Sequence, residues 1–442
     1  MANAKFIQPV RRLRGEPRLP GDKSVSHRAA ILGTLAEGET RVSNFLLAQD
    51  CLNTVAACRE LGARIDQKGA DLVIHGRGPA GLAAPQRVID CGNSGTGVRL
   101  LAGVLAGQRF ESVLTGDEQV RRRPMRRIIE PLTRMGASID SEPGQLCPLR
   151  LHGRPLAGID YPSPVASAQV KSCLLLAGLF ASGQTTVRLP AASRDHTERM
   201  LRHFGAQVEQ GTRESSGGHW SASEGEWVTI QGGRSLRGCD ISVPVDISSA
   251  AFFLVAAALV PDSELLLKNV GVNPTRTGVL EVLERMGAGI RLESGRDAGG
   301  EPVADLAIRN TGRLRGRSIS GADLIPRLID ELPILAVAAA MAEGETVIED
   351  AAELRVKETD RISVLAGELR KIGVRVEERS DGLAIRGGEI RGGTADSHGD
   401  HRLAMSLAVA GLVSGEGVRI ERPECVDTSF PGFWELLAEV SA

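Results

Sequence analysis

The stretch Leu19–Arg28, LPGDKSVSHR, gathers two cations and a hydroxyl at one predicted helix start. A Pro-Gly pair breaks the backbone, and Asp22 or Ser24 can cap the apolar helix that follows. Lys23 and Arg28 then lie in its first turns, where free N–H groups and the helix dipole already favour anions. Such a cluster needs an anionic partner, either an acidic side chain elsewhere or a phosphorylated ligand.

Two further segments have the residues for anion binding. Gly95 and Gly97, in Asn93–Arg99, let a ligand approach the backbone closely, although a capped helix with small packing residues explains them equally well. The run of arginines at 121–127 is typical of a solvated face. Pro124 is the exception, because it fits the first turn of a helix and would fix the Arg123 guanidinium beside an N-terminus for bidentate binding.

Later helix starts add hydroxyls, amides and acids. Ser167 and Gln169 begin one helix, with capping by Ser167 as the simpler interpretation. Arg194 can bind phosphate or pair with Glu198. Asp330 is a helix cap, a general base, or both. The segment 354–361 is rich in charges, and 399–402 repeats the basic ending of the first motif. His398 and His401 have no third ligand, so no metal site is expected.

These starts belong to a repeat with a spacing of about 70 to 85 residues. Its copies begin near Gly21, Cys91, Ser167, Asp246, Asp330 and Gly399. Five copies carry a second helix that ends at a glycine, as in CRELGARI, PLTRMGASI, RHFGAQV, LERMGAGI and LRKIGVRV, and the sixth ends in FWELLAEV. Generic alternation of helices and strands is the alternative, but the turn recurs at the same place in each unit. We therefore expect two similar α/β domains with a boundary near 240, and exposed loops at 211–226 and 294–303.

Composition narrows the class of protein. The chain has 442 residues, a net charge of −2 and only 3% aromatic residues, which argues against a nucleic-acid-binding surface. Its seven cysteines form no CxxC pair, which is typical of reduced thiols. Since no membrane-length apolar run or signal-peptide pattern is present, we expect no membrane association and a cytoplasmic location.

The motifs together resemble the 5-enolpyruvylshikimate-3-phosphate synthase family over nearly the whole chain, in its class II branch. They are GDKSVSHR at 21–28, GNSGTGVR at 92–99, RRPM at 122–125, SPVASAQVKS at 163–172, SRDHTERM at 193–200, RVKETDR at 355–361 and GDHR at 399–402. The resemblance implies transfer of the enolpyruvyl group of phosphoenolpyruvate to the 5-hydroxyl of 3-phosphoshikimate, with phosphate released, in the shikimate pathway to chorismate and aromatic amino acids. It implies no metal and no organic cofactor, and we expect a monomer.

The resemblance also implies a fold of two domains, each of three βαβαββ units in an inside-out α/β barrel. The N-terminal domain would span 21–242, and the C-terminal domain 1–20 plus 243–442, with the active site in the cleft between them. Residues expected to bind 3-phosphoshikimate are Lys23, Ser24, Arg28, Ser167, Gln169, Arg194, Asp330 and Lys357. Those expected at phosphoenolpyruvate are Lys23, Gly95, Arg123, Gln169, Arg361 and Arg402.

The chemistry assigns three catalytic roles. The 5-hydroxyl loses a proton as it attacks C2 of phosphoenolpyruvate, and C3 gains one, while fixed donors hold the phosphate and carboxylate charges. Asp330, aided by Lys23, is the expected base, and Glu358 is the expected acid at C3. His27 is expected to be structural.

The chain departs from the family's class I pattern at Thr428, where class I has a lysine, and at Thr197-Glu198, where it has a tyrosine. Gly95 is retained where glyphosate-tolerant class II members carry alanine, so we expect glyphosate to compete with phosphoenolpyruvate. The enolpyruvyl transferase that acts on UDP-N-acetylglucosamine is the nearest alternative, but its loop cysteine is missing from 116–124. A non-catalytic anion-binding repeat protein is the other, and it would not need Asp330 or Glu358.

Overall fold

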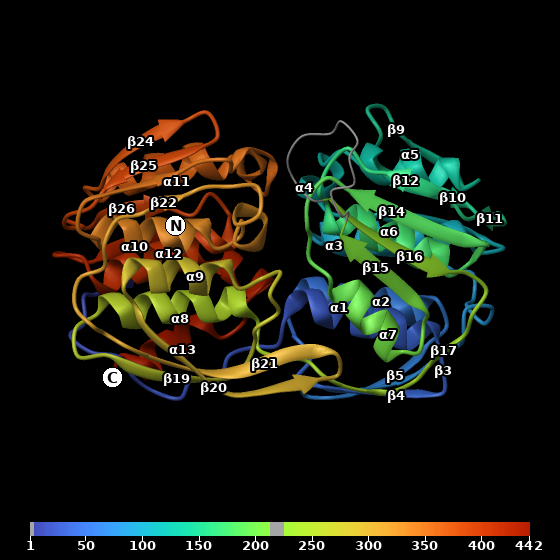
Figure 1. The fold of residues 1–442 in the computed structure, drawn as a ribbon, viewed down its shortest axis with the longest axis horizontal. Coiled ribbons are helices and arrows are strands. Elements are labelled where there is room, and N and C mark those ends of the chain that lie inside the picture. Colours follow the sequence, from blue (N-terminus) through green and yellow to red (C-terminus); the bar gives the residue numbers. More distant parts are fainter. Residues whose placement is uncertain (1–3, 213–224) are drawn as a thin grey trace. The chain divides into compact units, whose positions relative to one another are not determined.

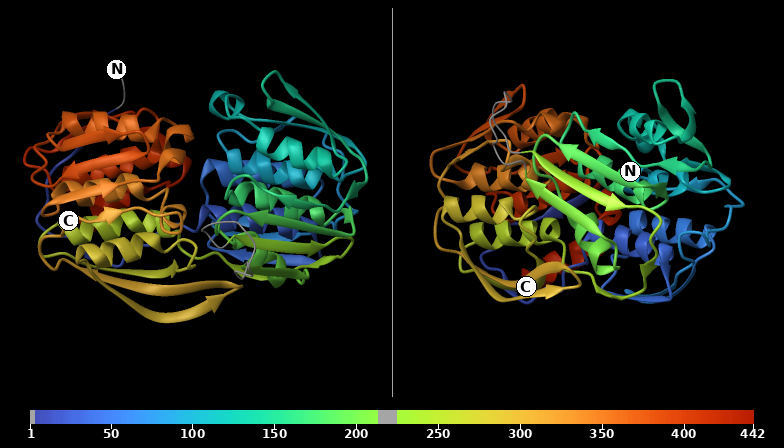
Figure 2. Two further views of the ribbon diagram at one scale, coloured as in Figure 1. Left: turned by 45° about the horizontal axis from the view of Figure 1, so that its top comes forward. Right: turned by 45° about the vertical axis from the view of Figure 1, so that its right-hand side comes forward.

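The computed structural model describes residues 4–212 and 225–442. The chain forms two compact units, shown in Figures 1 and 2. One consists of Gly21–Pro244 together with Asp297–Glu301, and the other of Met1–Pro20, Val245–Arg296 and Pro302–Ala442. We call them the 21–244 unit and the 245–442 unit.

The 21–244 unit contains three copies of one supersecondary pattern. The first copy consists of α1 (Lys23–Leu35), β4 (Glu39–Ser43), α2 (Gln49–Glu60), β5 (Arg64–Lys68) and β6 (Asp71–His75). The second consists of β7 (Ile89–Asp90), α3 (Gly95–Ala106), β8 (Glu111–Thr115), α5 (Arg126–Arg134), β9 (Ser138–Glu142) and β10 (Leu146–His152). The third consists of β12 (Asp160–Pro162), α6 (Ala168–Gly178), β14 (Gln184–Leu189), α7 (His196–His203), β15 (Val208–Thr212) and β16 (Glu226–Gln231). Each copy forms a four-stranded sheet in which the first strand is parallel to the second and the other pairings are antiparallel. The first copy borrows its first strand, β18 (Asp240–Ser242), from the end of the unit, and this pairing closes the unit on itself.

The 245–442 unit repeats the pattern. Its first copy consists of α8 (Ile247–Leu259), β19 (Glu264–Gly271), α9 (Gly278–Met286), β20 (Gly289–Ala298) and β21 (Glu301–Arg309). The second consists of β22 (Ser318–Ile319), α10 (Leu332–Met341), β23 (Glu345–Ile348), α11 (Arg361–Lys371), β24 (Arg375–Arg379) and β25 (Gly382–Arg386). The third consists of β26 (Gly393–Asp396), α12 (His401–Leu412), β27 (Val418–Glu421) and α13 (Phe433–Val440). The N-terminal strands β1 (Ala4–Ile7) and β2 (Arg14–Gly15) complete two of these sheets. Strands β1 and β2 therefore belong to this unit's sheets.

The first helix of each copy forms the core of its unit, and the sheets lie over it (Figure 2). Almost every residue of α3, α6, α8, α10 and α12 is buried. Helices α3 and α6 approach so closely at Gly103 that a Cβ there would lie 2.2 Å from the carbonyl oxygen of Cys173. A side chain at Gly103 would therefore force the two helices apart.

The shared glycine turn after each second helix is confirmed. The five glycines have φ values of 94°, 103°, 88°, 99° and 94° at Gly62, Gly136, Gly205, Gly287 and Gly373. Only glycine adopts this left-handed conformation without strain, and it ends the helix before the next strand begins. The predicted α/β class is thus correct, and the βαβαββ repeat is present in five copies. The sixth has only β26, α12, β27 and α13, and its sheet takes β1 as its third strand.

The loop expected at 294–303 is wrong. Strands β20 and β21 run through it and leave only Gly299 and Gly300 between them. The exposed, charged residues of β20 give this hairpin the composition of a loop. In the loop expected at 211–226, the two ends belong to β15 and β16, and 213–224 lies outside the described residues.

Candidate active site

The start of α1 confirms the capping expected from the sequence. The side chain of Asp22 accepts a hydrogen bond from the backbone N–H of Val25 at 2.9 Å. Lys23, the first helical residue, forms an ion pair with Asp50, whose side chain is only 3% exposed. A buried carboxylate on α2 therefore holds the Lys23 ammonium.

Arg28 is buried beside hydroxyl groups from two other helices. Its Nε donates to Thr197 Oγ1 at 2.6 Å, and its Nη2 donates to Ser172 Oγ at 2.8 Å. Burial lowers its pKa to about 10, opposed by the carboxylates of Glu198, Asp22 and Glu301 and assisted by the nearby charge of Arg194. An anionic ligand beside the two guanidinium groups would be attracted to both. Ser24 lies one turn before Arg28 and accepts from Arg28 Nη1 through its carbonyl oxygen.

His27 lies under the helix starts. Its Nδ1 lies 2.7 Å from Thr54 Oγ1, and its Nε2 lies 3.3 Å from Ser94 Oγ, which also caps α3. Burial is the main cause that holds the pKa of His27 well below its usual value, and Lys23 and Arg28 add to it. A neutral imidazole that joins three helices supports the structural role expected for it.

Gly95, Arg123 and Gln169 meet around Arg99. Arg99 Nη1 donates to Gln169 Oε1 at 2.7 Å, and Gln169 Nε2 donates to Thr96 Oγ1 at 3.0 Å. A Cβ at Gly95 would lie 2.9 Å from Arg99 Nη1 and 3.1 Å from Arg123 Nη1. The glycine thus leaves space between two guanidinium groups, next to an oriented amide.

The expected place of Pro124 is wrong. Helix α5 begins at Arg126, with Met125 as its N-cap, so Pro124 precedes the helix. The backbone N–H of Met125 is bonded to the carbonyl of Gln145, which ties the chain to the β9–β10 turn before the helix begins. Arg123 is fixed instead by the short α4 (Glu118–Arg121), because its N–H donates to Val120 O.

The third helix start confirms the capping role of Ser167. Its Oγ accepts the N–H of Val170 at 3.4 Å and caps α6. Of the two alternatives for Arg194, pairing with Glu198 is not the contact that the structure gives for this carboxylate, since Glu198 Oε1 lies 2.5 Å from Lys171 Nζ of α6.

Three cations surround Asp330 in the 245–442 unit. Its Oδ1 lies 3.6 Å from Lys357 Nζ and 3.4 Å from Arg361 Nη1, and its Oδ2 lies 3.9 Å from Arg402 Nη2. Arg402 also donates to the Asp330 carbonyl at 3.1 Å. The three cations come from two parts of the chain, 357–361 and Arg402, and converge on the carboxylate of Asp330, which lies in a third.

Two acids fix Arg361 from its other sides. Its Nε lies 2.7 Å from Asp400 Oδ2, and its Nη2 lies 2.6 Å from Glu358 Oε2. Burial alone would lower the pKa of Arg361, but Asp400 and Glu358 raise it overall. Burial likewise opposes the charge of Asp400, yet Arg361 brings the pKa of that carboxyl below its usual value. Arg361 is therefore a fixed, permanent charge beside Glu358.

Asp330 is not the helix cap expected from the sequence. The N-cap of α10 is Glu331, and no side chain caps that helix. The Glu331 carboxylate instead pairs with Ser248 and lies 3.7 Å from Arg402 Nη1. Asp330, one residue earlier, stays directed at the cations.

Of the two histidines near α12, His398 contacts a carboxylate of α11. His398 Nε2 lies 2.8 Å from Glu368 Oε1, which fixes the turn before the helix. Within 4–212 and 225–442, no group of three His, Cys, Asp or Glu side chains is arranged to hold a metal ion.

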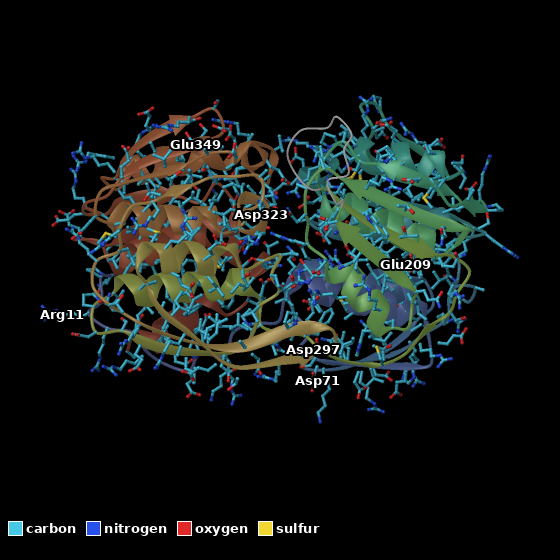
Figure 3. All side chains as sticks on the ribbon, in the orientation of Figure 1. Arg11, Asp71, Glu209, Asp297, Asp323 and Glu349 are labelled. Carbon is cyan, nitrogen blue, oxygen red and sulfur yellow. The ribbon has the colours of Figure 1, made fainter. Side chains whose placement is uncertain are left out.

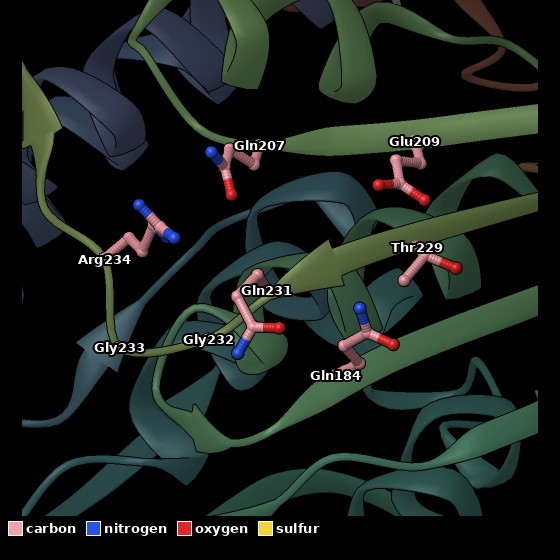
Figure 4. Close-up of a pocket in the computed structure, with 8 residues that line it drawn as sticks. All are labelled: Gln184, Gln207, Glu209, Thr229, Gln231, Gly232, Gly233 and Arg234. Carbon is pink, nitrogen blue, oxygen red and sulfur yellow. The ribbon is translucent and has the colours of Figure 1, made fainter.

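A cavity of about 480 Å³ lies on the β14–β16–β15 sheet (Figure 4). It is lined by Gln184, Gln207, Glu209, Thr229, Gln231, Gly232, Gly233 and Arg234. None of the expected site residues lines it. It is an open polar hollow on the sheet, apart from the helix starts of the 21–244 unit.

Sequence reasoning missed three residues that hold the site. Asp50 pairs with Lys23, Arg99 orients Gln169, and Asp400 fixes Arg361. Arg99 and Asp400 stand inside quoted motifs, which is the signal that could have found them. Asp50 stands in no motif, and its burial is set by the packing of α2.

Solved structures with this fold define the class. An EPSP synthase from Acinetobacter baumannii matches with a TM-score of 0.86 and 45% identity, covering 98% of this chain and 97% of that one. The enolpyruvyl transferase NikO from Streptomyces tendae matches with a TM-score of 0.78 and 21% identity, covering 99% and 97%, and so shares the fold. The protein has the two-domain fold of the enolpyruvyl transferases.

Sequence comparison shows which family of enolpyruvyl transferases the chain belongs to. A family model described as EPSP synthase (3-phosphoshikimate 1-carboxyvinyltransferase) matches residues 7–437. Relatives called 3-phosphoshikimate 1-carboxyvinyltransferase include one from Geobacter metallireducens, 53% identical with 99% of each chain covered. Another, from Bacillus cytotoxicus, is 51% identical with 100% of each chain covered. The chain belongs to the EPSP synthase family of transferases.

In the parts of the chain that the structure describes, no helix has both the length and the apolar character needed to cross a membrane.

Proposed function

We propose that this family member transfers the enolpyruvyl group of phosphoenolpyruvate to the 5-hydroxyl of 3-phosphoshikimate, using the residues predicted from its motifs. The observation that carries the proposal is the convergence of Lys357, Arg361 and Arg402 on Asp330, with Glu358 held beside Arg361. An anion-binding protein needs the cations alone. A reaction that moves protons between two anionic substrates needs acids among them.

The reaction assigns each group a task. Asp330 accepts the proton of the 5-hydroxyl as the oxygen bonds to C2, aided by Lys23. Glu358 donates a proton to C3. Loss of a proton from C3 and departure of phosphate then restore the double bond in the product. The acids act as proton carriers, and no net proton is consumed in this cycle.

The proposed binding residues form two sets, which share Lys23 and Gln169. The substrate 3-phosphoshikimate is bound in this proposal by Lys23, Ser24, Arg28, Ser167, Gln169, Arg194, Asp330 and Lys357. Phosphoenolpyruvate is bound by Lys23, Gly95, Arg123, Gln169, Arg361 and Arg402. The Arg28–Arg194 pair supports a phosphate site, because two nearby guanidinium groups are stabilised by a dianion. The Gly95 space between Arg99 and Arg123 supports the second site.

We also propose a cytoplasmic monomer that is open to inhibition by glyphosate. The support for the compartment is that all seven cysteines are free, five of them buried, as expected in a reducing environment.

A coupled phosphate-release assay tests the proposal. Release is expected with phosphoenolpyruvate and 3-phosphoshikimate together, and not when UDP-N-acetylglucosamine replaces 3-phosphoshikimate. Turnover with the nucleotide sugar, or with neither acceptor, contradicts it.

A further inference from the structure

A buried cluster of three charges lies in the third copy of the 21–244 unit. Lys171 of α6 is completely buried, and its Nζ lies 2.5 Å from Glu198 Oε1 on α7 and 2.7 Å from Glu226 Oε1 at the start of β16. Taking three charges out of water is costly, and apolar residues of similar volume are often equally stable. Stability alone therefore does not account for the cluster, and its geometry becomes the point of interest.

The Glu226 carboxylate does more than pair with Lys171. The same oxygen, Oε1, accepts the backbone N–H of Ser193 at 3.1 Å and the hydroxyl of Ser193 at 2.8 Å. Three donors thus share one partly buried acceptor, because the Glu226 side chain is 17% exposed. The chain at Ser193 is tied through Glu226 and Lys171 to α6, the helix that begins with Ser167 and Gln169.

Ser193 directly precedes Arg194, and the residues that follow are also fixed. Asp195 Oδ2 accepts from Arg199 Nε at 2.7 Å, and His196 Nδ1 lies 2.8 Å from Glu301 Oε1. The backbone is therefore held on both sides of Arg194. A guanidinium carried by such a fixed segment can bind a phosphate with little loss of conformational freedom.

The charges of the cluster complement those of the candidate phosphate site. One lysine faces two carboxylates, so the cluster carries an excess negative charge. Among the charges that raise the pKa of Arg28, Glu198 is the largest contributor. The cluster therefore lies close enough to Arg28 to stabilise the cations of this region.

We propose that Glu226 is a positioning residue for the phosphate group of the acceptor substrate. Through Ser193 it fixes Arg194, and through Lys171 it fixes that segment against α6. Glu226 touches no substrate. The inference rests on the proposed assignment of Arg194 to the phosphate of 3-phosphoshikimate.

The test compares Michaelis constants in Glu226→Ala. Because this change removes the acceptor of Ser193 but leaves the Lys171–Glu198 pair, KM for 3-phosphoshikimate is expected to rise about 10- to 100-fold. KM for phosphoenolpyruvate and kcat at saturation are expected to stay within about 3-fold of the parent. Glu226→Gln keeps an acceptor oxygen and is expected to restore most of the lost affinity. A purely structural role would move all three constants together, and that result overturns the proposal.

Glu209→Ala is the matched control. Glu209 is an exposed carboxylate on β15, the neighbouring strand of the same sheet, and it is labelled in Figures 3 and 4. Its loss is expected to leave every constant unchanged. If Glu226→Ala does not fold, Ser193→Ala removes one donor while keeping the charges, and is expected to raise the same KM alone. An unchanged KM in Ser193→Ala then overturns the proposal.

A double-mutant cycle with Arg194→Ala tests the positioning role of Glu226 separately from the assignment of Arg194 to the phosphate of 3-phosphoshikimate. Arg194→Ala is expected to raise KM for 3-phosphoshikimate, and adding Glu226→Ala to it is expected to have little further effect. If the two effects multiply, Glu226 acts independently of Arg194 and the positioning role is wrong. If Arg194→Ala leaves KM unchanged, the phosphate assignment itself is wrong, and the proposal falls with it. Turnover of 3-phosphoshikimate by the parent enzyme would remain in either case.

Discussion

Arg99 Nη1 donates a hydrogen bond to Gln169 Oε1 at 2.7 Å, although the two residues belong to different copies of the repeat. Burial lowers the pKa of Arg99 to about 10, with Arg123 and Arg127 contributing in the same direction. Burying a charged arginine side chain lowers the free energy of unfolding unless the guanidinium group is well hydrogen-bonded. The Gln169 oxygen supplies one such bond, and in return the amide of Gln169 is turned toward Thr96. Arg99 therefore orients a residue that we assign to both substrates.

Replacing Arg99 with methionine tests this relationship. The variant keeps an unbranched side chain but releases the Gln169 amide and one cation near Arg123. Because hydrogen bonds to charged groups are the stronger ones, we expect kcat/KM for phosphoenolpyruvate to fall about 10- to 100-fold. Steady-state kinetics at fixed 3-phosphoshikimate give the value. Arg109→Met is the control, since Arg109 is exposed just after the same helix. Equal kinetics in the two variants would show that the bond is incidental.

Removing the carboxylate of Asp330 should affect the chemical step. In Asp330→Asn the side-chain shape is kept but the proposed base is lost, so kcat is expected to fall about 10²- to 10⁴-fold. Single-turnover measurements separate this loss from slower product release. Asp323→Asn is the control, because Asp323 is an exposed carboxylate of the same unit, labelled in Figure 3. Full turnover in Asp330→Asn would disprove the assignment of Asp330 as the base.

The space at Gly95 predicts how an inhibitor competes. A Cβ there would lie 2.9 Å from Arg99 Nη1 and 3.1 Å from Arg123 Nη1, so both guanidinium groups would have to shift. In Gly95→Ala we expect the inhibition constant of glyphosate to rise and KM for phosphoenolpyruvate to rise by a smaller factor. Competition kinetics with glyphosate measure both quantities. An unchanged inhibition constant would mean that the steric account of Gly95 is wrong.

The architecture could be predicted well from the sequence because each copy of the repeat contains the same short local signals. Each glycine turn lies at the same place in its copy, and only glycine suits its left-handed backbone. The helix starts likewise appear as small and polar residues before apolar runs. Side-chain partners could not be predicted in this way. Glu198 lies one helical turn from Arg194 in the sequence, yet it pairs with Lys171 of another helix.

The same limit applies to the outer hairpin and to the cations of the site. Charged residues on β20 gave it the composition of a loop, because residues 291–297 of this edge strand are all exposed, on both of its faces. The family resemblance placed Asp330, Lys357 and Arg361 among the expected substrate-binding residues. Their convergence depends on how α10 and α11 pack, which hydrophobic periodicity does not specify.

The buried imidazole of His27 predicts a pH dependence of stability. Its pKa is well below the usual 6.5 in the folded state, chiefly because of burial. Below pH 6.5 the unfolded chain therefore binds a proton that the folded chain excludes, and the folded state loses stability as the pH falls. Above pH 6.5 this contribution is complete. One such group changes the free energy of unfolding by at most about 1.4 kcal/mol for each pH unit. In His27→Asn, which keeps a neutral donor near Thr54, we expect a shallower loss of stability between pH 7.5 and 5.5.

Urea unfolding at several pH values measures this slope for the parent and the variant. His152 provides a control of opposite sign, because its hydrogen bonds to Asp140 and Glu111 raise its pKa. A raised pKa gives stability that is present below 6.5 and is lost as the pH rises, so His152→Gln should steepen the acid loss. Parallel slopes for the parent and His27→Asn would mean that His27 takes up its proton in the folded protein at the same pH as in the unfolded chain. The neutral hydrogen-bonded link between α1, α2 and α3 would then be wrong.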